Sequence, residues 1–328
     1  MTLLFYTAAN GEYEKFVPLY IYTSLSSIPE SYVEIGLEDP DQFVKNNAEL
    51  VENLRELFGS RFKLTTVEFN NRLPGVVRFV TEPELADKCD YVYIGDIDML
   101  IFDKNLKSKH LENMSENDAP FSNIIRGPAH TEGDNYRLSG LHFAPTDVQY
   151  PIPDLTDIDY SQENDVRGAD ENVLYKIMKR KGYMISEDMD FRPVHGIHMR
   201  TNSHPFGSRK RVRPNNSFEE ISSGDVRVPW SGLEVEDYRN SFTQMLNEPQ
   251  FQSMYFQLDI EIKNLLMILE NVAEGRFDSF EEEAFTYIIT EAYYETLIRK
   301  VTRIAYDDGI GSAFKSVVEH IYQKIKQQ

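Results

Sequence analysis

Short apolar segments alternate with amphipathic ones through the N-terminal third of the chain, and this alternation constrains the fold more than any other feature. Strands are predicted at residues 3–7, 32–37, 61–69 and 91–94. Helices are predicted between them at residues 14–25, 39–58 and 72–86. A chain that alternates strand and helix in this way is expected to form an α/β domain, with a mostly parallel sheet flanked by helices.

The strand predicted at residues 91–94 ends on two carboxylates, Asp96 and Asp98. Because side chains alternate along an extended chain, both point to the same side where the strand leaves the core. Apolar residues resume at 99–102 and hold the pair at the rim of that core. Two converging carboxylates suit a hard divalent cation, and α/β sheets bind ligands at the carboxyl ends of their strands. The alternative is a solvated turn that happens to carry two acids.

Two later segments supply further polar candidates. An apolar segment at residues 136–145 is interrupted by Ser139 and Gly140, where small residues also allow a simple close approach of two chains. A helix predicted at residues 168–182 begins with Asp170 and Glu171. Asp170 can be read as a helix N-cap, whereas Glu171 at a helix start facing the expected cleft favours a catalytic or acceptor-binding role.

Three of the seven histidines, His195, His198 and His204, lie within ten residues of one another. Any one of them alone is more often a structural histidine, but their clustering favours a functional role. Mg²⁺ or Mn²⁺ held by two carboxylates and an imidazole can bridge the oxygens of a diphosphate and stabilise a departing nucleoside diphosphate.

Composition excludes several classes of function. The net charge of −20 argues against a nucleic-acid partner, because such binding depends on Lys and Arg. The single cysteine, Cys89, excludes an internal disulfide framework and fits a reducing compartment. No apolar run approaches the ~18–20 residues that span a bilayer, and no signal peptide is expected at the N-terminus. We therefore expect a cytoplasmic protein, and contact with a membrane surface stays open.

The pattern of the chain changes after residue 206. We expect a catalytic domain over residues 1–206, a linker over 207–235 and a helical C-terminal region over 236–328. The linker contains a basic run at 209–213, which is most often solvated. The C-terminal region carries helical apolar stripes and no converging titratable cluster, so we expect it to act in homo-oligomer or membrane contact.

The order of these motifs resembles glycosyltransferase family 8, whose members have the GT-A fold. Ala8, Asn10 and Tyr13 match the family's first nucleotide-binding segment, and Arg78-Phe79 stands where the family has an Arg-Leu or Arg-Phe pair. Asp96-Ile-Asp98 matches the metal-binding Asp-x-Asp motif, and Leu138-Ser-Gly140 is similar to the family's Asn-Ser-Gly strand. Asp170-Glu171 is similar to its Asp-Gln helix start, and His198 corresponds best to its late histidine. The resemblance covers about residues 1–206.

This resemblance implies a GT-A (Rossmann-like) glycosyltransferase with Mn²⁺ or Mg²⁺ as cofactor. The implied metal ligands are Asp96, Asp98 and His198, and the implied catalytic residues are Asp170 and Glu171. The implied donor-binding residues are Thr7, Ala8, Asn10, Tyr13, Arg78, Asp96, Ser139, Gly140, Arg200 and His204. The expected donor is a nucleotide-diphosphate sugar, UDP-linked rather than GDP-linked. The expected acceptor is a glycan or lipid-linked molecule, as in polysaccharide biosynthesis.

The chain departs from the family at the phosphate contact. The family follows its histidine with Lys-Pro-Trp, and the nearest match here is His204-Pro-Phe206. Arg200, His204 or the 209–213 run could supply the contact instead. Residues 168–172 also resemble the acidic loop of inverting GT-A enzymes, so a retaining and an inverting outcome both stay open.

Two other functions compete with this interpretation. An Asp-x-Asp phosphohydrolase would use Asp96 as a phosphorylated nucleophile, but it would normally carry Thr, Ser or Val soon after the motif, where this chain has Met99-Leu. A non-catalytic module that binds nucleotide sugars is the second alternative. Turnover of nucleotide sugars, as opposed to phosphate esters, separates the three.

Overall fold

A computed structural model of the chain describes residues 1–70, 72–126, 136–156, 169–185, 189–199, 232–233 and 235–274. The chain forms two compact units. The first consists of Met1–His198 with Gly232–Ile262, and the second of Met199–Ser231 with Lys263–Gln328. The first unit contains the central sheet and the candidate site, and the description below concerns this unit.

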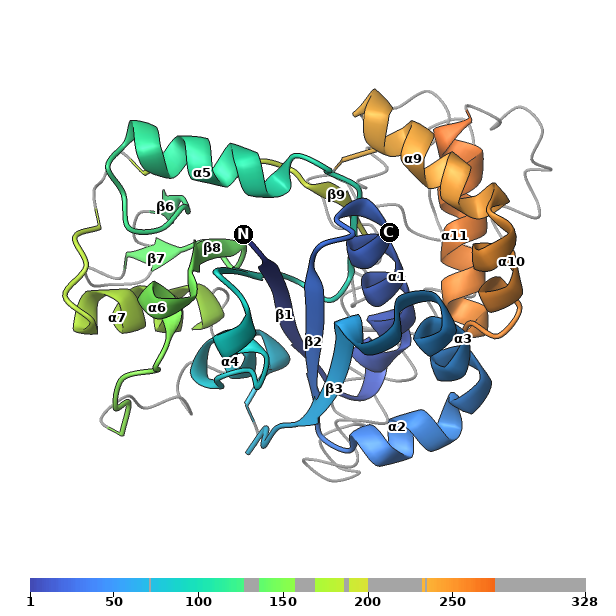
Figure 1. Cartoon of the computed structure of the whole chain (residues 1–328), viewed down its shortest axis with the longest axis horizontal. Helices are drawn as coiled ribbons and strands as arrows, with labels where there is room; N and C mark the ends of the chain where they lie inside the picture. The colour runs from blue at the N-terminus through green and yellow to red at the C-terminus, as the bar shows by residue number, and fades with distance from the viewer. Residues whose placement is uncertain are drawn as a thin grey trace, which may run out of the picture. The chain divides into compact units, whose positions relative to one another are not determined.

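The central sheet has five strands in the order β3-β2-β1-β4-β8. Their bounds are β1 Leu3–Ala9, β2 Tyr32–Leu37, β3 Phe62–Thr66, β4 Tyr91–Ile94 and β8 His142–Pro145. The first four are parallel, and β8 runs antiparallel to β4. Figure 1 shows β1, β2 and β3 side by side. The α/β class and the mostly parallel sheet are therefore confirmed. Strand β1 is the middle strand of this sheet, and all seven of its residues are buried.

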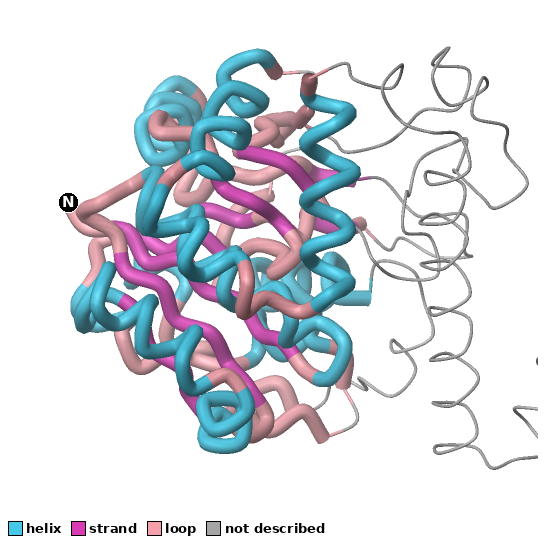
Figure 2. Tube along the Cα trace, turned by 90° about the vertical axis from the view of Figure 1, so that its right-hand side faces the viewer, coloured by secondary structure: helices cyan, strands magenta, loops and turns pink. Residues whose placement is uncertain are grey.

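Helices cover both faces of this sheet, as the cyan and magenta segments of Figure 2 show. Alternate residues of a strand face opposite sides. On one side Phe5 meets the rings of Tyr20, from α1 (Val17–Ser27), and of Tyr93. On the other side, Leu4 and Tyr6 share a core with residues of α4 (Pro74–Val80) and α7 (Ala169–Arg180).

Two predicted helices are shorter in the structure. The helix predicted at 39–58 is divided into α2 (Pro40–Asn46) and α3 (Ala48–Phe58), because Asn47 has non-helical angles and its side chain donates to the Phe43 carbonyl. Asp39 followed by Pro40 predicts a capped helix start, and Asp39 does cap α2, accepting a hydrogen bond from the Gln42 amide at 2.9 Å. The helix predicted at 72–86 ends at Val80, since Thr81 is extended.

Helix α5 was not predicted. The polar sequence of residues 103–135 predicts loops and one strand at 119–125, but α5 spans Leu106–Glu116. Only Leu106 and His110 of this helix are buried, so its apolar periodicity is too weak to signal a helix. The strand predicted at 119–125 is present as isolated bridges, Ser122 with Phe143 and Ile124 with Asp190, followed by β6 (Ile125–Arg126).

Small strands beside the central sheet bring distant segments together. β5 (Met99–Ile101) pairs antiparallel with β9 (Gly196–His198), and β6 pairs with β7 (Arg137–Leu138). A Cβ on Gly196 would lie 1.7 Å from the Leu100 carbonyl oxygen, so this pairing requires glycine there. The remaining short helices are η1 Gly11–Phe16, η2 Gly59–Arg61, η3 Ala86–Lys88 and α6 Thr146–Gln149.

Part of the region that the sequence assigned to a C-terminal helical domain belongs to the first unit. Helix α10 (Pro249–Tyr255) packs against α3 and against α9 (Glu236–Asn247), and α11 spans Ile260–Ala273. The Tyr22 hydroxyl donates to Glu248 at 2.7 Å, and the Phe251 ring lies 5.2 Å from the Tyr22 ring. Lys15 and Glu261 form an ion pair at 2.5 Å. Most of the predicted linker and the stripes beyond residue 274 lie outside the described residues.

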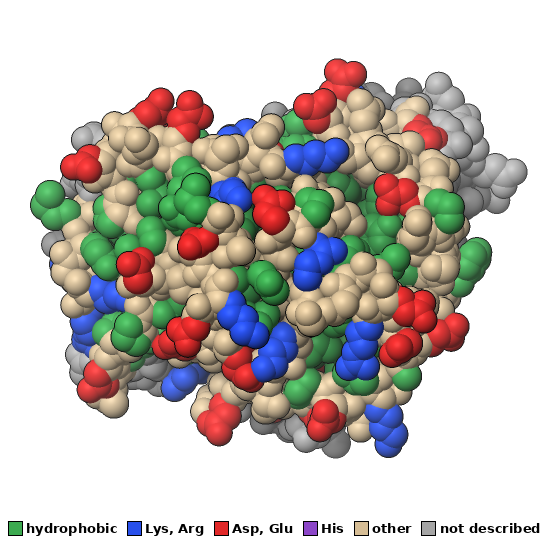
Figure 3. Space-filling model, in the orientation of Figure 1, with side chains coloured by type: hydrophobic (Ala, Val, Ile, Leu, Met, Phe, Trp, Pro, Cys, Tyr) green, Lys and Arg blue, Asp and Glu red, His purple; other side chains and the backbone are tan. Residues whose placement is uncertain are grey.

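The surface of the described residues is mixed in charge on the face that Figure 3 draws. Acidic, basic and apolar side chains are interspersed there. Within the part of the chain that the structure describes, no helix is both long enough and apolar enough to cross a membrane.

Candidate metal and substrate site

Asp96, Asp98 and His198 come together at the carboxyl edge of the sheet. One ligand atom from each lies within 4.8 Å of the other two. His198 Nε2 is 3.0 Å from Asp98 Oδ1 and 3.8 Å from Asp96 Oδ2. Ligands bound about 2.1 Å from one ion lie at most about 4.2 Å apart, and both measured separations are shorter than that limit. Two carboxylates and an imidazole are a ligand set that could hold Mn²⁺ or Mg²⁺ at this place.

The backbone explains why these three residues meet. β4 ends at Ile94, and the turn through Asp96 leads directly into β5. Across the β5–β9 pair, Met99 lies opposite His198, so the histidine stands beside the residue that precedes Met99. Ile97, which stands between the two aspartates in the chain, is buried in the core. The carboxylates on either side of it lie near His198 instead.

Arg78 holds the Asp96 carboxylate in place. Its guanidinium is buried and donates to the Gly95 carbonyl at 2.6 Å, to Asp96 Oδ1 at 2.5 Å and to Asp170 Oδ2 at 3.0 Å. Burial favours the neutral form of Asp96, but Arg78 and His198 outweigh it, so the pKa of Asp96 lies well below its usual range. Asp96 is therefore ionised at neutral pH, as a metal ligand must be.

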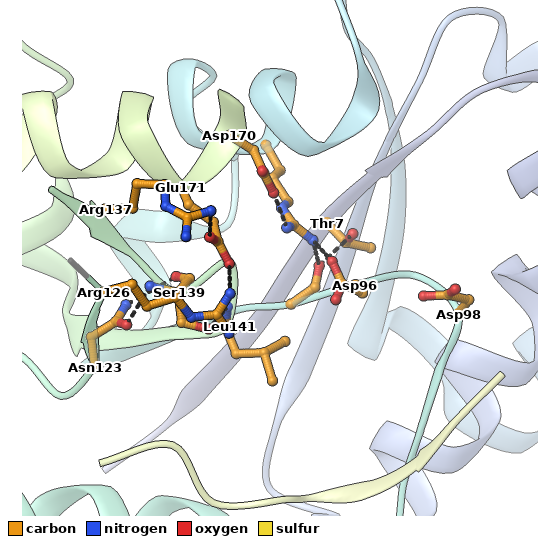
Figure 4. A network of polar contacts seen from close by, with 12 residues as sticks. Thr7, Asp96, Asp98, Asn123, Arg126, Arg137, Ser139, Leu141, Asp170 and Glu171 are labelled. Carbon is orange, nitrogen blue, oxygen red and sulfur yellow. Dashed lines mark hydrogen bonds and ion pairs between the residues drawn. The ribbon is translucent and has the colours of Figure 1, made fainter. Parts of the chain in front are cut away.

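Asp170 and Glu171 sit at the start of α7 in different environments, as Figure 4 shows. Asp170 is held through one oxygen by Arg78, and its side chain is 26% exposed. Glu171 is held through both oxygens, by Arg126 at 2.5 Å and Arg137 at 3.1 Å, and its side chain is 11% exposed. Burial raises the pKa of Glu171 despite these two arginines.

Gly140 lies beside the Arg78 guanidinium, and Ser139 precedes it in the chain. The Ser139 amide donates to Asn123 Oδ1 at 2.8 Å, and Asn123 Nδ2 donates back to the Ser139 carbonyl at 3.1 Å. Figure 4 shows this contact beside the Glu171 group. Ser139 is thereby fixed in the core, and Gly140 leaves the space that the Arg78 guanidinium needs.

The predicted donor residues of the first strand divide into two groups. Thr7 is buried, and its hydroxyl donates to the Gly95 carbonyl at 2.9 Å, so it supports the turn that carries Asp96. Ala8 packs with Val67 and Val77. Asn10 follows the end of β1, and the Tyr13 amide donates to its carbonyl at 3.0 Å. Because β1 and β4 are parallel neighbours, Asn10 and Tyr13 lie at the same edge as the metal ligands.

His195 lies apart from the metal ligands. It is buried with Nδ1 2.9 Å from Asp103 Oδ2 and Nε2 2.8 Å from His110 Nε2, and burial lowers its pKa. Residues three apart in extended chain face opposite sides, which predicts that His195 and His198 face different ways, and this position agrees with that prediction. Arg200, His204 and the basic run at 209–213 lie outside the described residues.

Several site residues were not predicted from the sequence: Asn123, Arg126, Arg137 and Arg192. The arginines that hold Glu171 come from β6 and β7, where Arg126 lies opposite Arg137. No motif or spacing relates these strands to the start of α7, because the contact depends on the folded chain.

No protein-family model matches the chain, and no curated protein sequence matches it. Among solved structures it is similar to the bifunctional IspDF from Campylobacter jejuni, with 14% identity over 57% of this chain and 48% of that one, and a TM-score of 0.32. It is also similar to the galactosyltransferase LgtC in complex with donor and acceptor sugar analogues, with 15% identity over 60% of this chain and 85% of that one, and a TM-score of 0.40. A third is the mannosyltransferase PcManGT from Pyrobaculum calidifontis in complex with GDP-Man and Mn²⁺, with 11% identity over 98% of this chain and 87% of that one, and a TM-score of 0.34.

This chain spans about half the length of IspDF. At TM-scores of 0.40 or less, these similarities carry no argument about the reaction of this chain. The proposal below rests on the residues of the site itself.

Proposed function

We propose that this protein is a divalent-metal-dependent glycosyltransferase of the GT-A, family-8-like kind, which transfers a sugar from a nucleotide-diphosphate donor to a glycan or lipid-linked acceptor. The observation that carries the proposal is the convergence of Asp96, Asp98 and His198 at the carboxyl edge of a mostly parallel sheet. A metal ion bound there would act as a Lewis acid toward the diphosphate of the donor.

The chain's own residues suit the parts that such a site needs. Arg78 fixes Asp96 and Asp170 to one guanidinium, so the metal ligands and the start of α7 are held together. Asn10 and Tyr13, at the end of β1, are placed to contact the nucleotide. UDP is the nucleotide that the motifs favour over GDP.

Asp170 is the better of the two acids for direct contact with the substrate. One of its oxygens has no partner among the residues that the structure describes, and its side chain is the more exposed of the pair. Both oxygens of Glu171 are engaged by arginines. We therefore assign Asp170 to the catalytic position and Glu171 to the positioning of Arg126 and Arg137.

Hydrolysis of nucleotide sugars tests the proposal without an acceptor. The purified protein is incubated with UDP- and GDP-sugars, with and without Mn²⁺, and the release of nucleoside diphosphate is measured. We expect metal-dependent release from a UDP-sugar, and its loss in Asp98→Asn. Hydrolysis of phosphate esters with all nucleotide sugars left intact would favour the phosphohydrolase instead, and binding without turnover would favour a non-catalytic module.

A further inference from the structure

The charges around the metal ligands do not balance once a diphosphate is bound. Asp96 and Asp98 offset a divalent ion, and the diphosphate then adds further negative charge. Arg78 does not compensate for it, because its guanidinium is buried and already shared by Asp96 and Asp170. In a chain of net charge −20, the site needs another cation on its solvent side.

Arg192 is held in place by its neighbours on the chain. Two residues earlier, Asp190 forms a β-bridge with Ile124, and three residues later His195 is buried against the Tyr93 ring. The ring of Phe191 packs inward on the His110 ring, with 5.4 Å between centroids. Arg192 itself is exposed. Its backbone is therefore anchored while its side chain stays accessible.

The segment that carries Arg192 runs from the bridge of Asp190 with Ile124 to β9, which ends at His198, so Arg192 lies on a segment that borders the candidate site. It interacts electrostatically with Asp96, with Glu171 and with Arg126. It makes no hydrogen bond or ion pair with any residue in the described ranges. Glu171 already has both oxygens occupied by Arg126 and Arg137, so it does not neutralise Arg192. Arg192 thus brings a guanidinium that has no ion-pair partner among the described residues close enough to act electrostatically on Asp96.

We propose that Arg192 binds the diphosphate of the donor beside the metal site. The inference rests on the proposed function and names the phosphate contact for which the sequence has no Lys-Pro-Trp. A guanidinium suits this task because its planar set of N–H donors can bind two phosphate oxygens at once. A diphosphate is favoured over a charged acceptor group, because Arg192 interacts electrostatically with Asp96, a proposed metal ligand, and the diphosphate would bind at the metal.

The same charge has opposite effects on the two ligands. Arg192 repels a metal ion that binds without nucleotide, whereas it attracts a diphosphate that binds after the metal. Arg192→Ala should therefore leave Mn²⁺ affinity unchanged or tighter and should weaken UDP affinity by about 10- to 100-fold, the loss of a charged hydrogen bond. A residue that only stabilised the fold would lower both affinities together.

Calorimetry on the full chain separates these outcomes. Mn²⁺ is titrated alone, and UDP is then titrated at saturating Mn²⁺, for the wild type, Arg192→Ala, Arg192→Lys and the control Arg55→Ala on α3. Arg55 is also an exposed arginine, with a side chain that is 54% exposed. We expect Arg192→Lys to bind UDP with intermediate affinity, because it keeps the charge without the planar donors, and Arg55→Ala to match the wild type.

Wild-type UDP affinity in Arg192→Ala would overturn the inference and leave the proposed function standing. Joint loss of Mn²⁺ and UDP binding in that variant would overturn it as well, because it would show a structural role. A wild-type protein that binds neither UDP nor GDP with Mn²⁺ would overturn the proposed function itself.

Discussion

Gly140 lies so close to Arg78 that a Cβ built on it would come within 2.6 Å of guanidinium Nη2. The same Cβ would lie 3.1 Å from Asp170 Oδ2. Arg78 is the only group in the described site that contacts both Asp96 and Asp170. The missing side chain at position 140 therefore keeps open the space in which Arg78 ties Asp96 to the start of α7.

Replacing this glycine tests the importance of that space. We expect Gly140→Ala to lower the unfolding free energy by about 1–3 kcal/mol, the usual cost of overpacking, and to reduce donor hydrolysis because the Arg78 guanidinium must move. Gly75→Ala is the matched comparison. Its Cβ would meet Asp170 Oδ2 at 3.1 Å, and alanine gains up to about 1 kcal/mol of helix propensity in α4. Urea unfolding and donor hydrolysis measure both variants, and equal tolerance would show that Arg78 has room to spare.

The two aspartates of the motif should differ in what their loss does to the fold. Asp98→Asn removes a metal ligand without touching Arg78, so we expect weaker Mn²⁺ binding and little change in unfolding free energy. Asp96→Asn also weakens the contact with buried Arg78, so it should lose Mn²⁺ binding together with about 1–3 kcal/mol of stability. Calorimetry and urea unfolding on both variants decide this. Full Mn²⁺ affinity in either one would remove that carboxylate from the ligand set.

His198 and His195 should also differ, because loss of the first should affect metal binding and loss of the second should affect stability. His198→Ala is expected to weaken Mn²⁺ and UDP binding with the fold intact, because His198 faces the two aspartates. His195→Ala is expected to keep the metal and to lose about 1–3 kcal/mol, because buried Asp103 and His110 each lose a partner. If His195→Ala loses the metal and His198→Ala keeps it, the two roles are reversed.

The sequence indicated those parts of the molecule that depend on local patterns. Strands β1, β2 and β4 follow from short apolar runs, and the cap on α2 follows from Asp39-Pro40. The carboxylates that end β4 were also visible, because a polar pair after a buried strand marks the rim of a core. The cluster with His198 was predicted from its resemblance to a family, and the structure brings the three ligand atoms together.

Features that depend on pairing between distant segments could not be predicted in this way. The ion pairs of Arg126 and Arg137 with Glu171 require β6 and β7 to lie beside the start of α7. Nothing in the local sequence specifies that these segments meet. Helix α5 was missed because its surface is polar almost all round. The packing of α10 on α1 includes a buried aromatic contact between Tyr22 and Phe251, which the helical periodicity does not predict.

That contact ties α10 to the unit that contains the candidate site, and this can be tested. Phe251 is fully buried, so Phe251→Ala should lower the unfolding free energy by about 3–5 kcal/mol. Phe256 is 73% exposed and is the control, and Phe256→Ala should change stability little. Thermal unfolding followed with and without UDP and Mn²⁺ measures the effect. An unchanged transition in Phe251→Ala would show that α10 contributes little to the stability of the first unit, as expected for the separate C-terminal helical region that the sequence predicts.

Buried His142 predicts how stability depends on pH. Burial lowers the pKa of His142 to about 3, whereas the pKa of a histidine in the unfolded chain is about 6.5. Below about pH 6.5 the unfolded chain therefore binds a proton that the folded chain does not, and the unfolding free energy falls as the pH is lowered. Each such proton contributes a slope of about 1.4 kcal/mol per pH unit. His142→Gln cannot take up this proton and can still accept the Asn123 side-chain hydrogen bond, so its unfolding free energy should fall less steeply between pH 6 and pH 4. Urea unfolding across that range compares the two proteins, and parallel slopes would show that His142 is not a source of the acid sensitivity.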